Sequence, residues 1–361
     1  MSVLYADEQI ALALRTLYAQ HGYRPYKVNQ FEEYDLYARN RRFLTGEQIL
    51  TFSDTDGKLM ALKPDVTLSI VKNTRDGDTP LKVSYAEHVC RVPRGAVGFK
   101  EIMQAGVECI GDIDVYAMGE VLMLAAKSLQ IISPRYALDV SDMGIVSGIL
   151  AGETIGDDER AQLLALISEK NLHELRARCA ALHVQPRTAA LLEALVTVCG
   201  PLEETLEALT QLGLPETCAP AVESLRAVSR MMRAQGIDRV NLDFSVVNDM
   251  SYYNGLIFTG FVDGIAGSVL SGGRYDPLLR RMGRSSQAIG FAVYLDQLER
   301  FLYTREPHDV DVLILYDDAT DPLTVADAVS AQTAQGHSVR AQQCEGSVRA
   351  SLIIDLRGRR E

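Results

Sequence analysis

NLDFSVVNDMSYYNGLIFTGFVDGIAGSVLSGGRYD, residues 241–276, is the stretch that decides the fold. We predict strands over Leu242–Val247 and Gly255–Val262, because both runs are rich in β-branched and aromatic residues and a turn-prone Asn-Asp-Met-Ser segment separates them. Tyr252 and Tyr253 follow that turn, and Tyr275 follows a pair of glycines. Glycine lets a backbone approach a neighbouring group closely. The stretch therefore predicts the floor of a small-molecule pocket.

Polar residues that could complete this pocket lie in the first third of the chain. We predict strands over Lys82–Val92 and Ile102–Ile110, and a helix that begins near Asp65. Strand alternation places Gln104 and Glu108 on one face. That face either contacts a ligand or is the solvated outer side of an antiparallel sheet, which is the commoner arrangement.

The domain organisation follows from changes in composition along the chain. Residues 137–243 contain no aromatic residue and are dominated by Leu and Ala with interleaved Glu and Arg, which is typical of a helical bundle. We therefore predict an α+β core made of residues 1–150 and 237–305, a helical insertion at 151–236, and a small C-terminal α/β unit at 306–361. The core is expected to be an antiparallel sheet flanked by helices.

Composition excludes several classes of function. The chain of 361 residues has a net charge of -12 and a pI near 5.1, which disfavours nucleic acid as a partner. Its six cysteines lack C-x-x-C spacing, which is typical of reduced thiols in a cytoplasmic protein. We find no signal peptide, no apolar run of membrane length, no metal-ligand spacing, no Walker loop and no G-x-S-x-G motif.

What remains is a set of polar residues at predicted strand and helix ends, in a mixture that suits an amino-acid zwitterion. Carboxylates would bind the ammonium or an imidazole, and the arginine would bind the carboxylate. Two other interpretations stay open: the tyrosines pack the sheet, or Arg91 and Glu108 form a structural ion pair. The candidate residues are Asp65, Thr67, Arg91, Gln104, Glu108, Tyr252, Tyr253 and Tyr275.

Five motifs in order resemble the catalytic core of histidyl-tRNA synthetase and of its paralogue, the ATP phosphoribosyltransferase regulatory subunit. They are LKPDVT (62–67), YAEHVCRVPRGAVGFKEIMQAGVECIG (85–111), VVNDMSYYNG (246–255), LSGGRYD (270–276) and AIGFAVYLDQLERF (288–301). The resemblance implies a class II synthetase fold and a dimer formed through the N-terminal helix and strand. It also implies that most of the candidate residues form a histidine pocket, with Asp65 in the place of a glutamate.

Departures from the synthetase pattern fall on the ATP-binding part. Asn248 and Asp249 stand where synthetases have the catalytic arginine, Tyr294 replaces a glycine that lies close to the adenine, and Gln297 replaces an arginine that holds the phosphates. Adenylate formation needs such fixed cations. The loop after Arg91, which includes Pro93 and Arg94, is also shorter than usual. We therefore expect no adenylation.

The resemblance then favours a non-catalytic regulatory subunit. It implies a short-form ATP phosphoribosyltransferase catalytic subunit as partner, L-histidine as a ligand, and a homodimer within a larger hetero-oligomer. No catalytic residue, metal or cofactor is expected, tRNA and membrane are not expected as partners, and the location is cytoplasmic. The alternative is a histidyl-tRNA synthetase or another histidine-activating relative.

Overall fold

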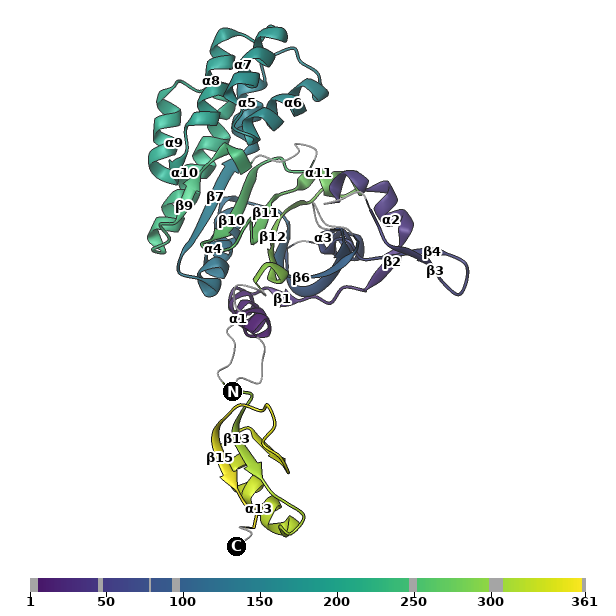
Figure 1. Ribbon diagram of the computed structural model, residues 1–361. Helices are drawn as coiled ribbons and strands as arrows, with labels where there is room; N and C mark the ends of the chain where they lie inside the picture. The colour runs from purple at the N-terminus through teal and green to yellow at the C-terminus, as the bar shows by residue number, and fades with distance from the viewer. Residues whose placement is uncertain are drawn as a thin grey trace. The chain divides into compact units, whose positions relative to one another are not determined.

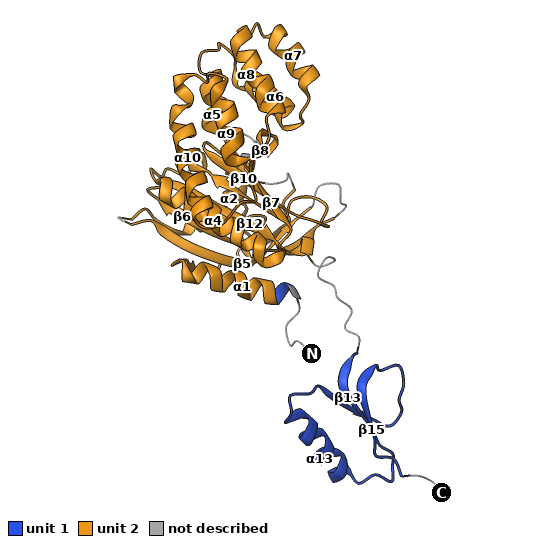
Figure 2. Ribbon diagram, turned by 90° about the vertical axis from the view of Figure 1, so that its left-hand side faces the viewer, with its two compact units in different colours: residues 1–8, 302–361 blue, residues 9–301 orange. Residues whose placement is uncertain are grey.

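The computed structural model describes residues 6–44, 48–77, 79–92, 98–246, 252–298 and 308–358. Two compact units make up the chain, one of residues 9–301 and one of residues 302–361 with residues 1–8 (Figure 2). The larger unit contains every predicted pocket residue.

A mixed, mainly antiparallel sheet is the centre of the larger unit (Figure 1). Among its described strands, only the β1–β5 and β7–β9 pairs are parallel. The predicted α+β fold, with an antiparallel sheet and flanking helices, is confirmed. In spatial order the described strands are β1 (Arg24–Pro25), β5 (Leu81–Arg91), β6 (Lys100–Gly111), β12 (Gln287–Tyr294), β11 (Leu270–Arg274), β10 (Leu256–Val262), β7 (Tyr136–Asp142), β9 (Val240–Leu242) and β8 (Gly200–Pro201).

One face of this sheet is apolar and is covered by helices α1 (Ala6–Gln20) and α4 (Val115–Ile132). The edge of the Tyr18 ring packs on Phe291 with ring centroids 5.9 Å apart. Among the described residues, α4 is the only helix long and apolar enough to cross a membrane, but 67% of it is buried within the fold. It is therefore a core helix of this sheet.

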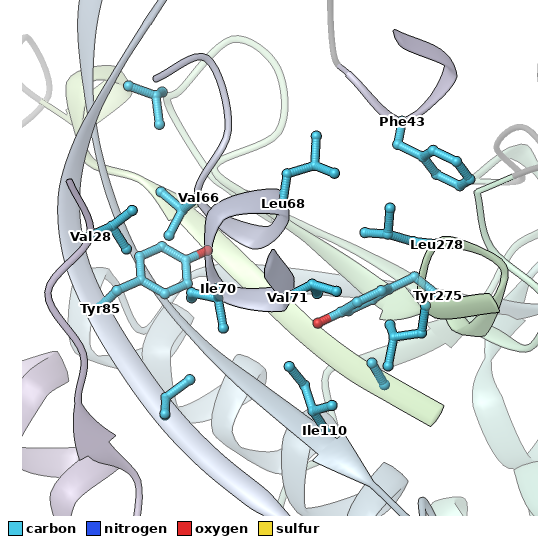
Figure 3. Close-up of a cluster of buried hydrophobic side chains, with 14 of the residues drawn as sticks. Val28, Phe43, Val66, Leu68, Ile70, Val71, Tyr85, Ile110, Tyr275 and Leu278 are labelled. Carbon is cyan, nitrogen blue, oxygen red and sulfur yellow. The ribbon is translucent and has the colours of Figure 1, made fainter. Parts of the chain in front are cut away.

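The opposite face of the sheet carries the predicted pocket residues. Above it lie α3 (Val66–Asn73), α11 (Asp276–Arg281) and a small sheet of strands β2 (Phe31–Glu33), β4 (Leu59–Leu62) and β3 (Thr51–Ser53). Helix α2 (Tyr34–Arg39) and the short helix η1 (Arg41–Phe43) complete this layer. The apolar side chains of the layer form one buried cluster (Figure 3).

Helices occupy most of the segment that we predict to be an insertion, and they lie together at one end of the sheet (Figure 1). Small residues allow close contact with the core: Met231 of α10 packs where α4 has Gly119, and Cys218 packs where α5 has Gly148. The domain limits themselves stay a prediction. Helix α5 (Met143–Leu150) of the predicted core comes just before this segment. The described helices of the segment are α6 (Asp157–Ser168), α7 (Leu172–Ala181), α8 (Pro186–Thr197), α9 (Leu202–Gln211), η2 (Glu216–Cys218) and α10 (Ala219–Ala234).

The predicted strand Leu242–Val247 is wrong. Strand β9 ends at Leu242, and residues Phe244–Val246 form the short helix η3. The Asp243 carboxylate accepts a hydrogen bond from Ser245 N at 2.8 Å, and such local side-chain bonds compete with strand pairing. The turn after this helix lies outside the described residues.

The smaller unit is a three-stranded parallel sheet with one helix, an arrangement of the α/β kind expected for the C-terminal unit. Its strands β13 (Val310–Leu315), β14 (Val339–Gln342) and β15 (Ala350–Asp355) are arranged in the order β14-β13-β15. Helix α13 (Pro322–Thr333) follows β13, and η4 (Leu295–Leu298) is the last described element of the larger unit. No residue of α13 is buried, so this unit has a small core.

Candidate functional site

The start of α3 positions the first two predicted residues. Asp65 is the N-cap of the helix and accepts a hydrogen bond from Leu68 N at 2.8 Å. This bond fixes the first turn, in which the buried Thr67 hydroxyl donates to Glu108 Oε1 at 2.7 Å. The LKPDVT motif therefore presents one hydroxyl to the central sheet.

Glu108 on β6 is the centre of the site. Its side chain is 2% exposed, and the Tyr275 hydroxyl donates to its Oε2 at 2.5 Å. On the neighbouring strand, Gly290 leaves space for the carboxyl group, because a Cβ atom there would collide with Oε2. Burial raises the pKa of Glu108 to about 8, although the hydrogen bonds from Thr67 and Tyr275 lower it. Glu108 is therefore mainly protonated at neutral pH.

Three tyrosines close one side of the site. The rings of Tyr252 and Tyr253 have centroids 4.4 Å apart, and those of Tyr252 and Tyr275 are 6.2 Å apart. The Tyr253 ring packs directly on Gly273, where a larger residue would not fit, because a Cβ atom there would lie 2.8 Å from the ring. The tyrosines therefore pack against the sheet beside Glu108, and their place in a ligand pocket stays a prediction.

Gln104 and Arg91 lie on the same sheet face. Gln104 is 4% exposed, so the interpretation of this face as a solvated outer side is wrong. Arg91 is also buried, and within the described residues no ion pair joins it to Glu108. Its positive charge instead acts on Asp65: burial raises the pKa of Asp65, while the bond from Leu68 and the Arg91 charge lower it.

Three further residues of this site were not among the predicted ones. Tyr85 lies opposite Gly106, whose Cβ atom would lie 2.7 Å from the Tyr85 hydroxyl, and Figure 3 shows the Tyr85 and Tyr275 hydroxyls both pointing toward α3. Lys63 is 1% exposed and binds Glu87 with Nζ and Oε2 2.9 Å apart. Tyr85 and Glu87 share the strand parity of Arg91, and this signal could have found them.

Of the residues that stand in place of synthetase ATP-binding groups, some lie near the candidate site and others do not. Tyr294 extends along the pocket face, where its hydroxyl lies 2.8 Å from that of Ser271. Gln297 is an exposed residue of η4. Asn248, Asp249 and Arg94 lie outside the described residues.

The described site is charge-balanced without a ligand. The cations Lys63 and Arg91 face the carboxylates of Glu87 and Asp65, and Glu108 is mainly neutral. A zwitterion adds no net charge to such a site, whereas a polyanion would add several uncompensated charges. Within the described ranges, no group of His, Cys, Asp and Glu side chains could hold a metal ion. The charges of the described site therefore suit a zwitterion better than a polyanion.

The family model of histidyl-tRNA synthetase matches residues 4–298. The chain belongs to the histidyl-tRNA synthetase family. Within that family, the chain is 29% identical over 293 residues to an ATP phosphoribosyltransferase regulatory subunit of Alkaliphilus metalliredigens, an alignment covering 79% of this chain and 74% of the relative. The predicted resemblance to both branches of the family is confirmed.

Solved structures of the family share the fold. An ATP phosphoribosyltransferase regulatory subunit/histidyl-tRNA synthetase from Bacillus halodurans superposes with a TM-score of 0.80 at 23% identity, covering 99% of this chain and 97% of that one. A chain of the ATP phosphoribosyl transferase (HisG:HisZ) complex from Thermotoga maritima has a TM-score of 0.63 at 20% identity, with 81% and 98% covered. The expected synthetase-like fold is therefore confirmed.

Proposed function

We propose that the chain is a non-catalytic regulatory subunit of ATP phosphoribosyltransferase that binds L-histidine. The observation that carries the proposal is the cluster of buried polar side chains around Glu108, in which two cations face two carboxylates; such a cluster fits a zwitterion better than a nucleotide. Relatives named as regulatory subunits support the assignment of the partner. That partner is a short-form catalytic subunit, with which the chain forms a hetero-oligomer in the cytoplasm, itself built on a homodimer.

Each end of histidine has a proposed partner in the pocket. Arg91 binds the carboxylate, because a guanidinium presents two parallel donors to it. Glu108 and Tyr275 bind the imidazole or the ammonium, with Thr67 holding the Glu108 side chain in place. Gln104 and Asp65 supply further acceptors, and Tyr252 and Tyr253 supply the apolar wall.

Histidine activation, the alternative function, is disfavoured by the residues that stand where a synthetase would bind ATP. Tyr294, whose hydroxyl lies 2.8 Å from that of Ser271, stands where the synthetase pattern has a glycine, and we propose that its side chain fills the space that such a glycine leaves for adenine. The predicted insertion carries more acidic than basic residues, which also argues against tRNA as a partner. We propose that the catalytic arginines of the synthetases have no counterpart here.

Regulation requires histidine to bind the active and inhibited assemblies with different affinities. In the structure, the groups that would bind it hydrogen-bond one another through Glu108. Histidine must therefore take over at least one of these bonds, which would move α3 or the Tyr275 segment relative to β6. Such a displacement is how we propose that the pocket acts on the partner subunit.

Pyrophosphate exchange separates the two functions. The purified chain, incubated alone with histidine, ATP and labelled pyrophosphate, is expected to give no histidine-dependent label in ATP. A histidyl-tRNA synthetase assayed in parallel provides the positive control. Robust histidine-dependent exchange by the chain alone would show that it activates histidine and would overturn the proposal.

Calorimetry tests the pocket itself. Histidine titrated into the chain is expected to bind, and Tyr275→Phe and Thr67→Val should each weaken binding about tenfold, since each removes one hydrogen bond to Glu108. The exposed Glu33→Gln variant is the control and should bind like the parent chain. Equal affinity of the Tyr275→Phe variant and the parent would remove Tyr275 from the pocket.

A further inference from the structure

Strand β15 forms an open edge of the small C-terminal unit (Figure 2). It pairs with β13 on one side, and no described strand lies on its other side. Leu352 and Ile353 are large apolar residues, yet they are 47% and 44% exposed. An apolar edge strand presents unpaired backbone groups to which another strand can add. β15 is therefore suited to pairing with a further strand.

The other edge of the same sheet is protected against such pairing. Strand β14 has only four residues and carries the charged, exposed Arg340 within it, and a charge on a short edge strand opposes the addition of another strand. In β15, by contrast, residues 350–354 contain no charge and include three large apolar side chains in succession. Of the two edges of this sheet, β15 is the one that its sequence leaves open.

The backbone bonds of β15 show which of its groups are free. Leu356 N donates to Leu315 O of β13 at 2.7 Å, so in this parallel pairing the backbone groups of even-numbered residues face β13. By alternation, Ser351, Ile353 and Asp355 direct their N–H and C=O groups to the open edge. A strand that adds to β15 must therefore bond these odd-numbered residues.

The sequence of β15 is complementary to itself in an antiparallel register centred on Leu352. When Leu352 lies opposite Leu352 of a second copy, Ser351 lies opposite Ile353, and these odd-numbered residues form the hydrogen-bonded pairs. Ala350 then lies opposite Ile354, on the same face as the two leucines. The free backbone groups and the apolar side chains are thus matched together.

Charge favours the same register. Arg349, just before the strand, lies opposite Asp355 of the second copy, and two-fold symmetry repeats this pair at the other end. If Ile353 lay opposite itself, Arg349 would face Arg357, and like charges directly opposite each other are destabilising. A shift of one residue would place free backbone groups opposite groups already bonded to β13. The register centred on Leu352 therefore satisfies both backbone and charge.

We propose that β15 pairs antiparallel with β15 of a second copy of this chain, about a two-fold axis at Leu352, and joins two three-stranded sheets into one. Such a contact uses the same surface on both copies and closes on itself. Arg349 keeps its ion pair with Asp309 and Asp355 keeps that with Arg357, and each gains the opposite charge of the second copy. The pairing also enlarges a unit in which no residue of α13 is buried. It is independent of the histidine pocket and of the dimer expected through the N-terminal helix.

Disulfide cross-linking of the full chain tests the pairing. Leu352→Cys, made in a chain whose exposed Cys199 and Cys344 are changed to Ser, places two thiols at the axis. The Cα atoms of such a non-hydrogen-bonded pair lie about 4.5 Å apart, a distance that a disulfide spans. Mild oxidation should convert most of the chain to a covalent dimer on a non-reducing gel, at a rate that does not fall on dilution.

Cysteines at matched positions separate this pairing from random collision. Arg340→Cys on the opposite edge, and Ile353→Cys beside the axis, should each form the covalent dimer about tenfold more slowly or less, because their thiols do not meet. Ser351→Cys combined with Ile353→Cys should react quickly, since these two positions lie opposite each other. Equal rates for Leu352→Cys and Arg340→Cys would overturn the proposal, and faster reaction of Ile353→Cys would overturn the register.

Maleimide labelling of Leu352→Cys distinguishes other occupants of the edge. If the larger unit of the same chain covers β15, the thiol should label slowly while no covalent dimer forms. If nothing covers it, the thiol should label as fast as that of Arg340→Cys, again without a dimer. Either result would overturn the proposal, whereas slow labelling together with rapid formation of the covalent dimer would support it.

Discussion

Glu108 is a buried carboxyl group whose polar partners are two hydroxyls, Thr67 and Tyr275. Alternation along 103–109 was enough to predict that it shares a face with Gln104. Its protonation could not be predicted from the sequence, because it depends on burial by Thr67, Tyr275 and Gly290, which are brought together from distant segments. The sheet face on which Glu108 lies was thus predictable from the sequence, and its protonation state was not.

The raised pKa of Glu108 makes stability depend on pH. The ordinary value is 4.5 and the folded value is about 8, so between these pH values the folded state holds a proton that the unfolded state has lost. The free energy of unfolding contributed by Glu108 should therefore fall as pH rises from 4.5 to 8, by at most about 1.4 kcal/mol per pH unit. Urea unfolding of the parent chain and of Glu108→Gln at pH 6 and pH 8 measures the difference.

In that comparison Glu108→Gln removes the titrating group and keeps most of the side-chain volume. The stability of the parent relative to the variant should be higher at pH 6 than at pH 8. A difference that does not change with pH would mean that Glu108 is ionised throughout and that the pocket carries an additional negative charge.

Gly290 provides a second test at the residue scale. A Cβ atom at this position collides with the Glu108 carboxyl group and with the backbone of β6, so Gly290→Ala should lower the free energy of unfolding by about 1–3 kcal/mol. Gly152→Ala is the control, because a Cβ atom there has nothing within 4 Å. Thermal or urea unfolding of the two variants gives the comparison, and equal stability of both would contradict the packing described around Glu108.

At the scale of elements, the buried pair Lys63 and Glu87 connects the end of β4 to β5 just before α3 begins. Removing one partner leaves the other charge buried and unpaired. Lys63→Met should therefore destabilise the chain by about 3–5 kcal/mol, while Lys63→Met with Glu87→Leu should recover most of that loss. Urea unfolding of the single and double variants measures both effects.

The exposed pair Lys58 and Glu33 is the control for this cycle. Lys58→Met should give no measurable change, because exposed ion pairs contribute little. If Lys63→Met lowered the free energy of unfolding as little as Lys58→Met does, Lys63 would be hydrated, and its ion pair with Glu87 would not stabilise the segment before α3.

At the scale of elements, the strands expected over Lys82–Val92 and Ile102–Ile110 are confirmed as β5 and β6, whereas the prediction failed where a single side chain decided the outcome. The strand expected over Leu242–Val247 fails after Leu242 because the Asp243 carboxylate bonds Ser245 N and turns the backbone into η3. An aspartate can be part of a strand or can accept a hydrogen bond from the backbone just after it, and the local sequence does not show which of the two occurs. The same limit hid Lys63, whose partner Glu87 lies on another strand.

For the whole molecule, the order of motifs predicted the sheet and its family, since strands far apart in sequence had to meet for the tyrosines and Glu108 to share one site. A cavity of about 340 Å³ between α1 and β5 had no sequence signal, because alanines at helix and strand positions are ordinary core residues until the backbone holds them apart. The fold, and the grouping of these side chains on one face of the sheet, are thus accessible from sequence, and empty space is not.

The central claim is that this chain regulates a separate catalytic subunit. The most direct measurement is the rate at which a short-form ATP phosphoribosyltransferase joins ATP and phosphoribosyl pyrophosphate as the chain is titrated into it. The rate should rise to a plateau at a fixed ratio of the two chains, and histidine should then lower it, with Tyr275→Phe shifting inhibition to higher histidine. A catalytic rate that is unchanged by saturating amounts of the chain would contradict the account.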